Sequence, residues 1–370
     1  MRKIVFALSA AVFTLSALFP AHAQRPVDIL QARPPIRVRG TAQLSPTGLT
    51  PKQIRAVYKL PATGGSGTIA IIDAFDYLTA EKDLKVFSDT FGLPACTTAN
   101  GCFEKRNIGR PRTDSGWALE AALDIQWAHA IAPNAKILLV QAQTNSFIDL
   151  LNAVDYARNR ADVVAISMSW GGSEFDGEQE YDSYFTSQYG ATFFAASGDW
   201  GTGVIWPSSS PNIVSVGGTT LNLKSDGSLD SETAWYGSGG GVSLFESTPA
   251  YQTTYGVKNT GGKRAGPDVS YDADPISGFS VYTSTGYYGQ RGWLTVGGTS
   301  AGSPQWAAIR ALGGSNVKHA KIYADAASTG KANYFRDIVS GTNGSCALFC
   351  TAGTGYDYVT GVGSPLTTSF

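Results

Sequence analysis

Short runs of apolar residues alternate along the chain with segments whose apolar positions recur at helical spacing. The apolar runs are continuous rather than alternating, which is typical of strands that are buried on both faces. Strands of this kind, separated by helices, form parallel sheets that helices cover on both sides. The predicted strands are residues 68–75, 136–142, 163–171 and 191–198, and the predicted helices are residues 80–92, 147–159 and 179–190. We therefore predict an α/β fold with a mostly parallel central sheet and helices on both faces.

Polar loops follow several of these strands, after Ala74, Met168 and Ser197. In an open parallel sheet, ligands and reacting groups gather at the carboxyl ends of the strands. A further helix is predicted at LTPKQIRAVYKL, where Thr50 is a suitable N-cap and Pro51 occupies the first helical position. Functional side chains are therefore expected in the loops at one edge of the sheet.

One predicted helix carries two carboxyl groups in apolar surroundings. Residues 117–133 read WALEAALDIQWAHAIAP, in which Ala and Leu favour a helix and Pro133 helps to end it. Glu120 and Asp124 are four residues apart, so their side chains share one face. Acids at this spacing are often only solvated surface groups. In a partly buried site, however, two close carboxyl groups share protons and the pKa of one rises, so Glu120 is a candidate general base at acidic pH.

A candidate nucleophile lies near the C-terminal end of the chain. Residues 295–309 read TVGGTSAGSPQWAAI and place Ser300 among small residues before a predicted helix. Histidine is the usual proton acceptor for such a serine. His129 lies nine residues from Glu120 and faces away from it on the helix, and His319 lies in a polar stretch that we predict to be exposed. We interpret both as structural or surface residues, which leaves Glu120 as the candidate base.

Asp199 follows a predicted strand in the segment FFAASGDWG. An aspartate in such a turn can simply stabilise the turn through its own backbone. It can also stay protonated at low pH and donate a hydrogen bond to the oxyanion of a tetrahedral intermediate. Both interpretations stay open from the residues alone.

The N-terminus has the pattern of a secretory signal peptide. Arg2 and Lys3 precede an apolar run, and small residues at Ala21 and Ala23 form a cleavage site, so we expect cleavage after Ala23. The apolar run is shorter than the roughly 20 residues that a membrane-spanning helix needs. The segment 24–43 is rich in Pro and Arg and is expected to be extended or poorly ordered. These features predict a secreted or periplasmic protein that is not anchored in a membrane.

Charge gives little indication of a nucleic-acid partner. The formal net charge is −1 and becomes −3 when the two basic residues of the predicted signal peptide are removed. Such a balance provides no basic surface for nucleic acid. Charged residues make up only 15% of the chain, so few ion pairs are lost when carboxylates become protonated. This composition is compatible with tolerance of acid, although many secreted proteins share it.

The four cysteines form two close pairs, Cys96 with Cys102 and Cys346 with Cys350. In an exported chain, an even number in local pairs suggests two small disulfides that each close a short loop. A zinc site is the alternative, but the paired C-x-x-C spacing is missing and no histidine stands beside the cysteines in the sequence.

Several segments, in order, resemble the sedolisins, the serine-carboxyl peptidases. The segments are LTPKQIRAVYKLP, ALEAALDIQWAHAIAPNAKI, ISMSWGG, ASGDWG, PDVSYDADPISGFSVY, GGTSAGSP and TGYDYVTGVGSP. This resemblance implies a subtilisin-like fold and a peptidase domain over residues 44–370. It also implies that Ser300 is the nucleophile and Glu120 the general base. Asp124 would orient and acidify Glu120, and Asp199 would serve the oxyanion.

The resemblance implies binding residues as well. Ser169, Trp170 and Gly171 of ISMSWGG would line the substrate groove. One structural calcium ion would bind near the C-terminus, and Ca²⁺ does prefer carboxylate and carbonyl oxygens. The matching ligands are the carboxylates of Asp337 and Asp357 and the backbone carbonyls of Ile338, Gly353 and Gly355. We expect a monomer that acts on protein or peptide substrates.

Two departures from the family pattern stand out. Gly297 occupies a position that is serine in the family motif, and only residues 24–43 separate the predicted signal peptide from the peptidase domain, where members usually carry a long prosegment. Control of premature activity is therefore unexplained by the sequence.

The alternatives fit less well. GTSAG matches the G-x-S-x-G motif of α/β-hydrolases, but that fold needs an acid and then a histidine after the serine, and only His319 followed by Asp325 is present. An ordinary subtilisin would use a histidine with the aspartate of AIIDAF, so Asp73 is expected to be structural or peripheral. A calcium-stabilised homologue without activity, and an exopeptidase that releases tripeptides, remain as alternative functions.

Overall fold

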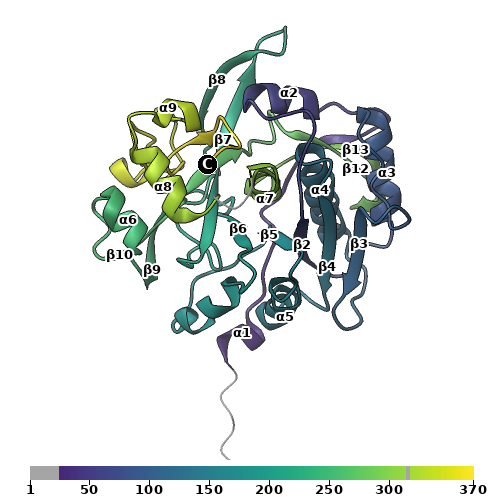
Figure 1. The fold of residues 1–370 in the computed structure, drawn as a ribbon, viewed down its shortest axis with the longest axis horizontal. Helices are drawn as coiled ribbons and strands as arrows, with labels where there is room; N and C mark the ends of the chain where they lie inside the picture. Colours follow the sequence, from purple (N-terminus) through teal and green to yellow (C-terminus); the bar gives the residue numbers. More distant parts are fainter. Residues whose placement is uncertain (1–24, 314–316) are drawn as a thin grey trace, which may run out of the picture.

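The computed structural model describes residues 25–313 and 317–370, and an eight-stranded sheet crosses its centre (Figure 1). Seven strands follow the order β11, β7, β6, β5, β2, β4, β3, and all neighbours along this path are parallel. β8 pairs with β7 in the antiparallel direction. The strands are β2 (Thr68–Ala74), β3 (Phe103–Asn107), β4 (Lys136–Ala142), β5 (Val163–Met168), β6 (Thr192–Ala196), β7 (Ile213–Leu223), β8 (Leu229–Ala234) and β11 (Val269–Asp272). The predicted α/β fold with a mostly parallel sheet is confirmed.

The four adjacent strands β6, β5, β2 and β4 are those that the apolar runs predict. Every residue of β2 and β6 is buried, and β4 exposes only Lys136. Apolar residues of neighbouring strands stand in register, as Ile71 does beside Leu139. The edge strand β3 does not show this pattern, because its sequence FEKRN is polar after the buried Phe103 and alternates between exposed and half-buried positions.

Helices cover both faces of the sheet (Figure 1). On one face, α4 and α7 pack against the strands with α2 and α3 beside them, and on the other face lie α5, η1 and α1. The predicted helix at residues 179–190 is a 3₁₀-helix that ends earlier, at Phe185. The elements are α1 (Pro26–Ile29), α2 (Pro51–Val57), α3 (Ala80–Phe91), α4 (Ser115–Ile131), α5 (Phe147–Arg158), η1 (Glu178–Phe185) and α7 (Gly302–Gly313).

The N-terminal segment packs onto the domain. β1 (Arg37–Gln43) pairs antiparallel with β13 (Gln290–Gly297), which pairs in turn with β12 (Phe279–Tyr287). The described part of this segment, residues 25–43, thus contains the short helix α1 as well as the extended chain that its composition predicts. Because β13 leads directly into the turn that carries Ser300, β1 lies next to the candidate nucleophile.

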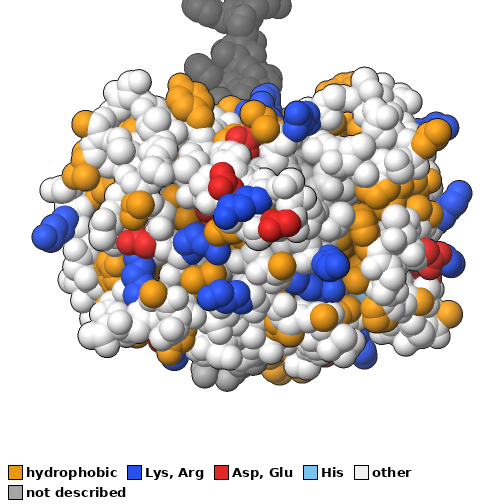
Figure 2. Space-filling view, turned by 90° about the horizontal axis from the view of Figure 1, so that it is seen from above, with side chains coloured by type: hydrophobic (Ala, Val, Ile, Leu, Met, Phe, Trp, Pro, Cys, Tyr) orange, Lys and Arg blue, Asp and Glu red, His pale blue; other side chains and the backbone are white. Residues whose placement is uncertain are grey.

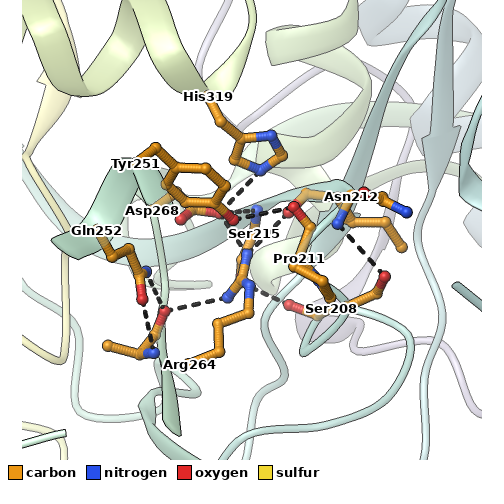
Figure 3. Close-up of polar contacts among 12 residues, drawn as sticks. Ser208, Pro211, Asn212, Ser215, Tyr251, Gln252, Arg264, Asp268 and His319 are labelled. Atoms are coloured by element: carbon orange, nitrogen blue, oxygen red, sulfur yellow. Dashed lines mark hydrogen bonds and ion pairs between the residues drawn. The ribbon is translucent and has the colours of Figure 1, made fainter. Parts of the chain in front are cut away.

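Small elements gather at the C-terminal side of the molecule, and a buried ion pair lies in this part (Figure 3). Arg264 Nη2 donates to Asp268 Oδ2 at 2.7 Å. Burial alone would raise the pKa of Asp268, but Arg264 and His319 outweigh it and the pKa falls to about 2. The stability that the ionised Asp268 contributes is therefore lost only as the pH falls toward about 2, where this carboxylate becomes protonated. The elements are α6 (Ala250–Tyr255), α8 (His319–Ala327), α9 (Lys331–Tyr334), η3 (Ala347–Cys350), β9 (Gly241–Ser247), β10 (Lys263–Gly266), β14 (Phe335–Arg336) and β15 (Ser364–Pro365).

His319 is not the exposed residue that its polar neighbours suggest. Its ring stacks on Tyr251 with the ring centroids 4.5 Å apart, and its Nε2 lies 3.6 Å from Asp268 Oδ2. Figure 3 shows the imidazole directed into this cluster. The prediction of exposure is wrong because segments distant in sequence enclose the ring: the connection between β10 and β11 supplies the carboxylate of Asp268, and α6 supplies the ring of Tyr251.

Both predicted disulfides are present. Cys96 and Cys102 are bonded with their Cα atoms 4.8 Å apart, and Cys346 and Cys350 with theirs 5.2 Å apart. His129, although remote in sequence, is buried beside the first disulfide, and its Nε2 contacts the carbonyl of Pro94 at 2.9 Å. Because the two sulfur atoms are bonded to each other, they are not thiolate ligands for zinc.

The surface carries few charges. Figure 2 shows one face on which Lys, Arg, Asp and Glu side chains stand in small groups among uncharged surface. Within residues 25–313 and 317–370, no helix combines the length and the apolar character that a bilayer crossing requires. The predicted signal peptide, residues 1–23, lies outside the described residues.

Candidate active site

Ser300 lies in a tight connection between β13 and α7. Gly298 has a φ of +111°, which only glycine adopts easily, and the single 3₁₀ turn η2 (Thr299–Ala301) then presents the serine at the start of the helix. The Ser300 side chain is fully buried, and its Oγ makes no hydrogen bond. A buried hydroxyl without a partner is available for proton transfer to a neighbouring base.

Glu120 and Asp124 project from α4 toward this turn. Both side chains are fully buried, and none of their carboxyl oxygens has a hydrogen-bond partner. Burial raises the pKa of Glu120 well above its ordinary value, and the charges of Asp124 and Asp73 raise it further. The Ser300 hydroxyl lies near enough to the Glu120 carboxyl to oppose this rise in pKa. The structure therefore brings together the predicted nucleophile and the predicted base.

Asp73 is a third member of this carboxyl cluster. It stands near the carboxyl end of β2 with both oxygens buried and unpartnered, and burial raises its pKa to about 8. Its charge raises the pKa of Glu120 and of Asp124, so it lies near both. Asp73 is therefore not peripheral, and its structural role stays a prediction. One feature of the sequence could have predicted that Asp73 belongs to the site: it stands near the carboxyl end of a predicted buried strand, where reacting groups gather in parallel sheets.

Asp199 approaches Ser300 from the loop after β6. Its Oδ1 accepts hydrogen bonds from the backbone N–H of Thr299 at 2.8 Å and from the Thr299 hydroxyl at 3.0 Å. Its Oδ2 accepts no hydrogen bond and lies 3.6 Å from Arg37 Nε. Burial raises the pKa of Asp199 to about 7 against the opposing effects of Thr299 and Arg37. This carboxyl group can therefore be a neutral hydrogen-bond donor at acidic pH.

The three residues predicted to line the substrate groove, Ser169, Trp170 and Gly171, do not share one environment. Ser169 is buried and donates to the carbonyl of Ser300 at 3.2 Å, and its hydroxyl lowers the pKa of Asp124. Trp170 is buried beside Phe147 and donates to the carbonyl of Ile72 at 2.9 Å. Of the three predicted residues, only Gly171 lines the neighbouring cavity of about 590 Å³, which the residues after β5 and β6 also line and whose lining does not include Ser300.

The predicted calcium ligands gather around the loop of residues 353–357. The carboxylate of Asp337 accepts from the N–H of Gly355 at 3.0 Å, and the carboxylate of Asp357 accepts from the N–H of Gly353 at 3.3 Å. The Lys331 ammonium lies 2.8 Å from Asp337 Oδ1 and 3.4 Å from the carbonyl of Gly355. The carboxylate of Asp337 and the carbonyl of Gly355 therefore already stabilise one positive charge, that of the Lys331 ammonium.

Comparison with known proteins gives consistent matches. Residues 108–327 match the model of the subtilase family. Sedolisin of Pseudomonas sp. (strain 101) is 29% identical over 88% of this chain and 60% of its own length. Kumamolisin of Bacillus sp. (strain MN-32) is 30% identical over 90% of this chain and 67% of its own length. Tripeptidyl-peptidase 1 of Dictyostelium discoideum is 28% identical over 86% of this chain and 57% of its own length. The chain thus spans 60% of the first of these relatives.

A solved structure of Pseudomonas sedolisin, a serine-carboxyl proteinase complexed with pseudo-iodotyrostatin, superposes with a TM-score of 0.73. The two chains are 30% identical, and the match covers 87% of this chain and 96% of the other. A psychrophilic protease with 18% identity and a TM-score of 0.55 shares the fold alone. The fold of this chain therefore has a counterpart in a solved sedolisin structure.

Proposed function

We propose that this chain, which belongs to the sedolisin family of serine-carboxyl peptidases, is an exported endopeptidase that hydrolyses peptide bonds at acidic pH. The observation that carries the proposal is the meeting of the unpartnered Ser300 hydroxyl with the Glu120 carboxyl in a buried cluster. Asp199 stands near by, with one carboxyl oxygen that accepts no hydrogen bond. Export is supported by the two disulfides, which persist in oxidising compartments.

The proposed mechanism needs only groups of this chain. Glu120 removes the proton from Ser300 Oγ while that oxygen attacks the carbonyl carbon of the substrate. The N–H of Ser300 and the protonated Asp199 donate hydrogen bonds to the resulting oxyanion. Glu120 then passes its proton to the leaving amine, and water hydrolyses the acyl-enzyme by the same steps. Asp124 and Asp73 position Glu120 and raise its pKa, which makes its carboxylate a stronger base than an ordinary glutamate.

The groove favours internal cleavage over the removal of tripeptides. Residues 31–37 of the chain lie along the groove past Ser300 and continue beyond it in both directions, toward α1 and into β1. A groove that accepts a continuous chain at both ends suits an endopeptidase. An enzyme that releases tripeptides needs a barrier three residues before the bond that it cleaves.

This choice can be tested with one protein substrate in two forms. In an assay from about pH 2 to about pH 8, we expect denatured protein to be cut at internal bonds on the acidic side of about pH 7, equally fast whether its N-terminus is free or acetylated. Mass spectrometry of the products identifies the bonds. If hydrolysis requires a free N-terminus and proceeds in steps of three residues, the endopeptidase proposal is refuted and the enzyme is a tripeptidyl-type exopeptidase. Absence of hydrolysis over the whole range would favour the non-catalytic homologue.

We also propose one structural calcium ion, held by the carboxylates of Asp337 and Asp357 and the carbonyls of Ile338, Gly353 and Gly355. The donor chemistry fits, because all these ligands are hard oxygens. The position of the Lys331 ammonium beside Asp337 and Gly355 supports a cation at this place and makes that ammonium the ion's competitor. The ion's role would be to join the loop of residues 353–357 to the strand end at Asp337.

Calcium is expected to raise the melting temperature, and a chelator to lower it. Saturation at about a hundred times the dissociation constant contributes about 2.7 kcal/mol to the free energy of unfolding. Thermal unfolding with and without calcium measures the effect. Asp337→Asn should remove it, whereas Lys331→Met should strengthen calcium binding because it removes the competing charge. A melting temperature that calcium leaves unchanged in the wild type and in Lys331→Met would contradict the site.

A further inference from the structure

A buried histidine lies beside the first disulfide. Cys96 and Cys102 close the loop between α3 and β3, and His129 reaches this loop from α4, which packs beside α3 (Figure 1). A ring nitrogen of His129 and the two sulfur atoms all lie within 4.8 Å of one another. In the described part of the chain, this is the one group of three histidine, cysteine or acidic side chains close enough to share a metal ion.

The imidazole of His129 is oriented as it is in a metal ligand. Its Nε2 lies 2.9 Å from the carbonyl oxygen of Pro94, so Nε2 carries the proton and donates it to this acceptor. The lone pair is then on Nδ1, which is buried and has no hydrogen-bond partner. Buried polar atoms are normally satisfied. A histidine that binds a metal usually donates its other N–H to a carbonyl or carboxylate, as His129 does to Pro94.

The two sulfur atoms can supply the other ligands when the disulfide is reduced. Zinc with Zn–S bonds of about 2.3 Å in tetrahedral geometry holds two thiolates about 3.8 Å apart, so the sulfur atoms need only separate from bonding distance to that spacing. Cys96 is buried, whereas Cys102 is partly exposed and gives a reductant and a metal ion access to the pair. Two thiolates and one imidazole are a ligand set that suits Zn²⁺.

We propose that the reduced chain binds one Zn²⁺ ion through the thiolates of Cys96 and Cys102 and through Nδ1 of His129. Water takes the fourth position of the tetrahedron. A trialkylphosphine and one water molecule convert the disulfide to two thiols, and the phosphine becomes its oxide. Zinc binding then releases the two thiol protons.

The ion takes over the structural task of the disulfide. It joins the loop of residues 96–102 to α4, the helix that carries Glu120 and Asp124. A chain that is still in the cytosol is in the reduced state, because thiols are kept reduced there. Zinc can therefore hold this loop on the helix until oxidation replaces the ion by the disulfide.

The second disulfide provides a contrast within the same molecule. Where the structure describes the chain, Cys346 and Cys350 belong to no such group of three ligands. Cys346 Sγ lies 3.6 Å from the hydroxyl of Thr202, which is neutral and is not among the usual zinc ligands. When reduced, this pair offers two ligands only, so it should bind zinc much more weakly than the first pair.

Cobalt(II) is the probe for the test, because it enters zinc sites and absorbs light when thiolates bind it. The full chain from Gln24 onward, with Cys346→Ser and Cys350→Ser, is reduced by a trialkylphosphine without air at neutral pH and titrated with Co²⁺. We expect thiolate-to-cobalt absorption that saturates at one ion per chain and disappears when Zn²⁺ is added. The oxidised protein should show none. The complementary variant, Cys96→Ser with Cys102→Ser, should bind Co²⁺ at least about 10-fold more weakly.

His129→Gln in the protein with the single Cys96–Cys102 pair tests the third ligand. The glutamine amide nitrogen can take the place of Nε2 and donate to Pro94, but nothing replaces the lone pair of Nδ1. We expect the affinity for Co²⁺ to fall at least about 10-fold, with thermal unfolding as the check of folding. X-ray absorption of the zinc-loaded protein reads the ligands without any substitution at His129, and it should show two sulfur atoms at about 2.3 Å and an imidazole nitrogen at about 2.0–2.1 Å. Undiminished affinity of folded His129→Gln, a spectrum without imidazole, or no thiolate-to-cobalt absorption would overturn the proposal.

Discussion

Replacing Glu120 by glutamine is expected to abolish peptide hydrolysis, with a fall in kcat on the order of 10⁴ or more. The amide has nearly the size and shape of the carboxyl group, so it keeps the packing of α4, but it cannot accept the proton of Ser300 Oγ. Ser300→Ala should have an effect of similar size, because nucleophile and base act as a unit. The measurement is kcat on a quenched peptide at acidic pH, made on protein whose folding has been checked by circular dichroism.

A control substitution separates loss of the base from loss of a buried carboxyl group. Asp83 on α3 is also fully buried, but it is satisfied by the Tyr77 hydroxyl at 2.6 Å and the Thr79 hydroxyl at 2.7 Å. Asp83→Asn should lower stability and leave kcat of the folded protein unchanged. Activity of Glu120→Gln within tenfold of wild type would refute Glu120 as the base and would direct attention to Asp73 or Asp124.

The sequence predicts the parts of this site that depend on local pattern. Continuous apolar runs identify β2, β4, β5 and β6, since burial on both faces leaves no polar positions to interrupt them. The spacing of Glu120 and Asp124 places both on one side of α4 wherever that helix lies. A serine among small residues before a helix predicts a tight turn, and Gly298 provides it.

What the sequence does not predict depends on contacts between distant segments. Nothing near His319 indicates that Asp268 and Tyr251 will enclose it. Asp73 looks like an ordinary strand residue until α4 is placed across β2. The composition of residues 24–43 predicts an extended chain, but only the pairing with Gly171 and with β13 shows that the chain crosses the groove.

Ser169 and Trp170 show a related difficulty. Their segment lies next to the groove, yet one side chain supports the backbone of Ser300 and the other fills the core below. Of these three residues, Gly171 is the one that pairs with residues 31–37, and it does so through backbone hydrogen bonds with Arg33. The direction of each side chain depends on the local twist after β5, which the order of residues does not reveal.

Asp199→Asn is expected to keep much of the activity and to move its alkaline limit upward. Burial raises the pKa of Asp199 to about 7, so in the wild type the protonated donor is present below about pH 7 and is lost as the pH rises through that value. An amide donates at every pH. Thr299 donates two hydrogen bonds to Oδ1, which will hold the amide oxygen in that position and direct the amide nitrogen to the place of Oδ2. The orientation needed by the oxyanion is therefore preserved.

Asp199→Ala provides the matched contrast, because it removes the donor altogether and should lower kcat by about 10² to 10³ at every pH. Profiles of kcat against pH for the wild type and the two variants measure the effect. If Asp199 instead acts as an ionised group, Asp199→Asn should resemble Asp199→Ala, and the alkaline limit of the wild type should not follow the pKa of this residue. A carboxyl donor explains why the enzyme would be confined to acidic solution: above about pH 7 the same group carries a negative charge beside the oxyanion that it must stabilise.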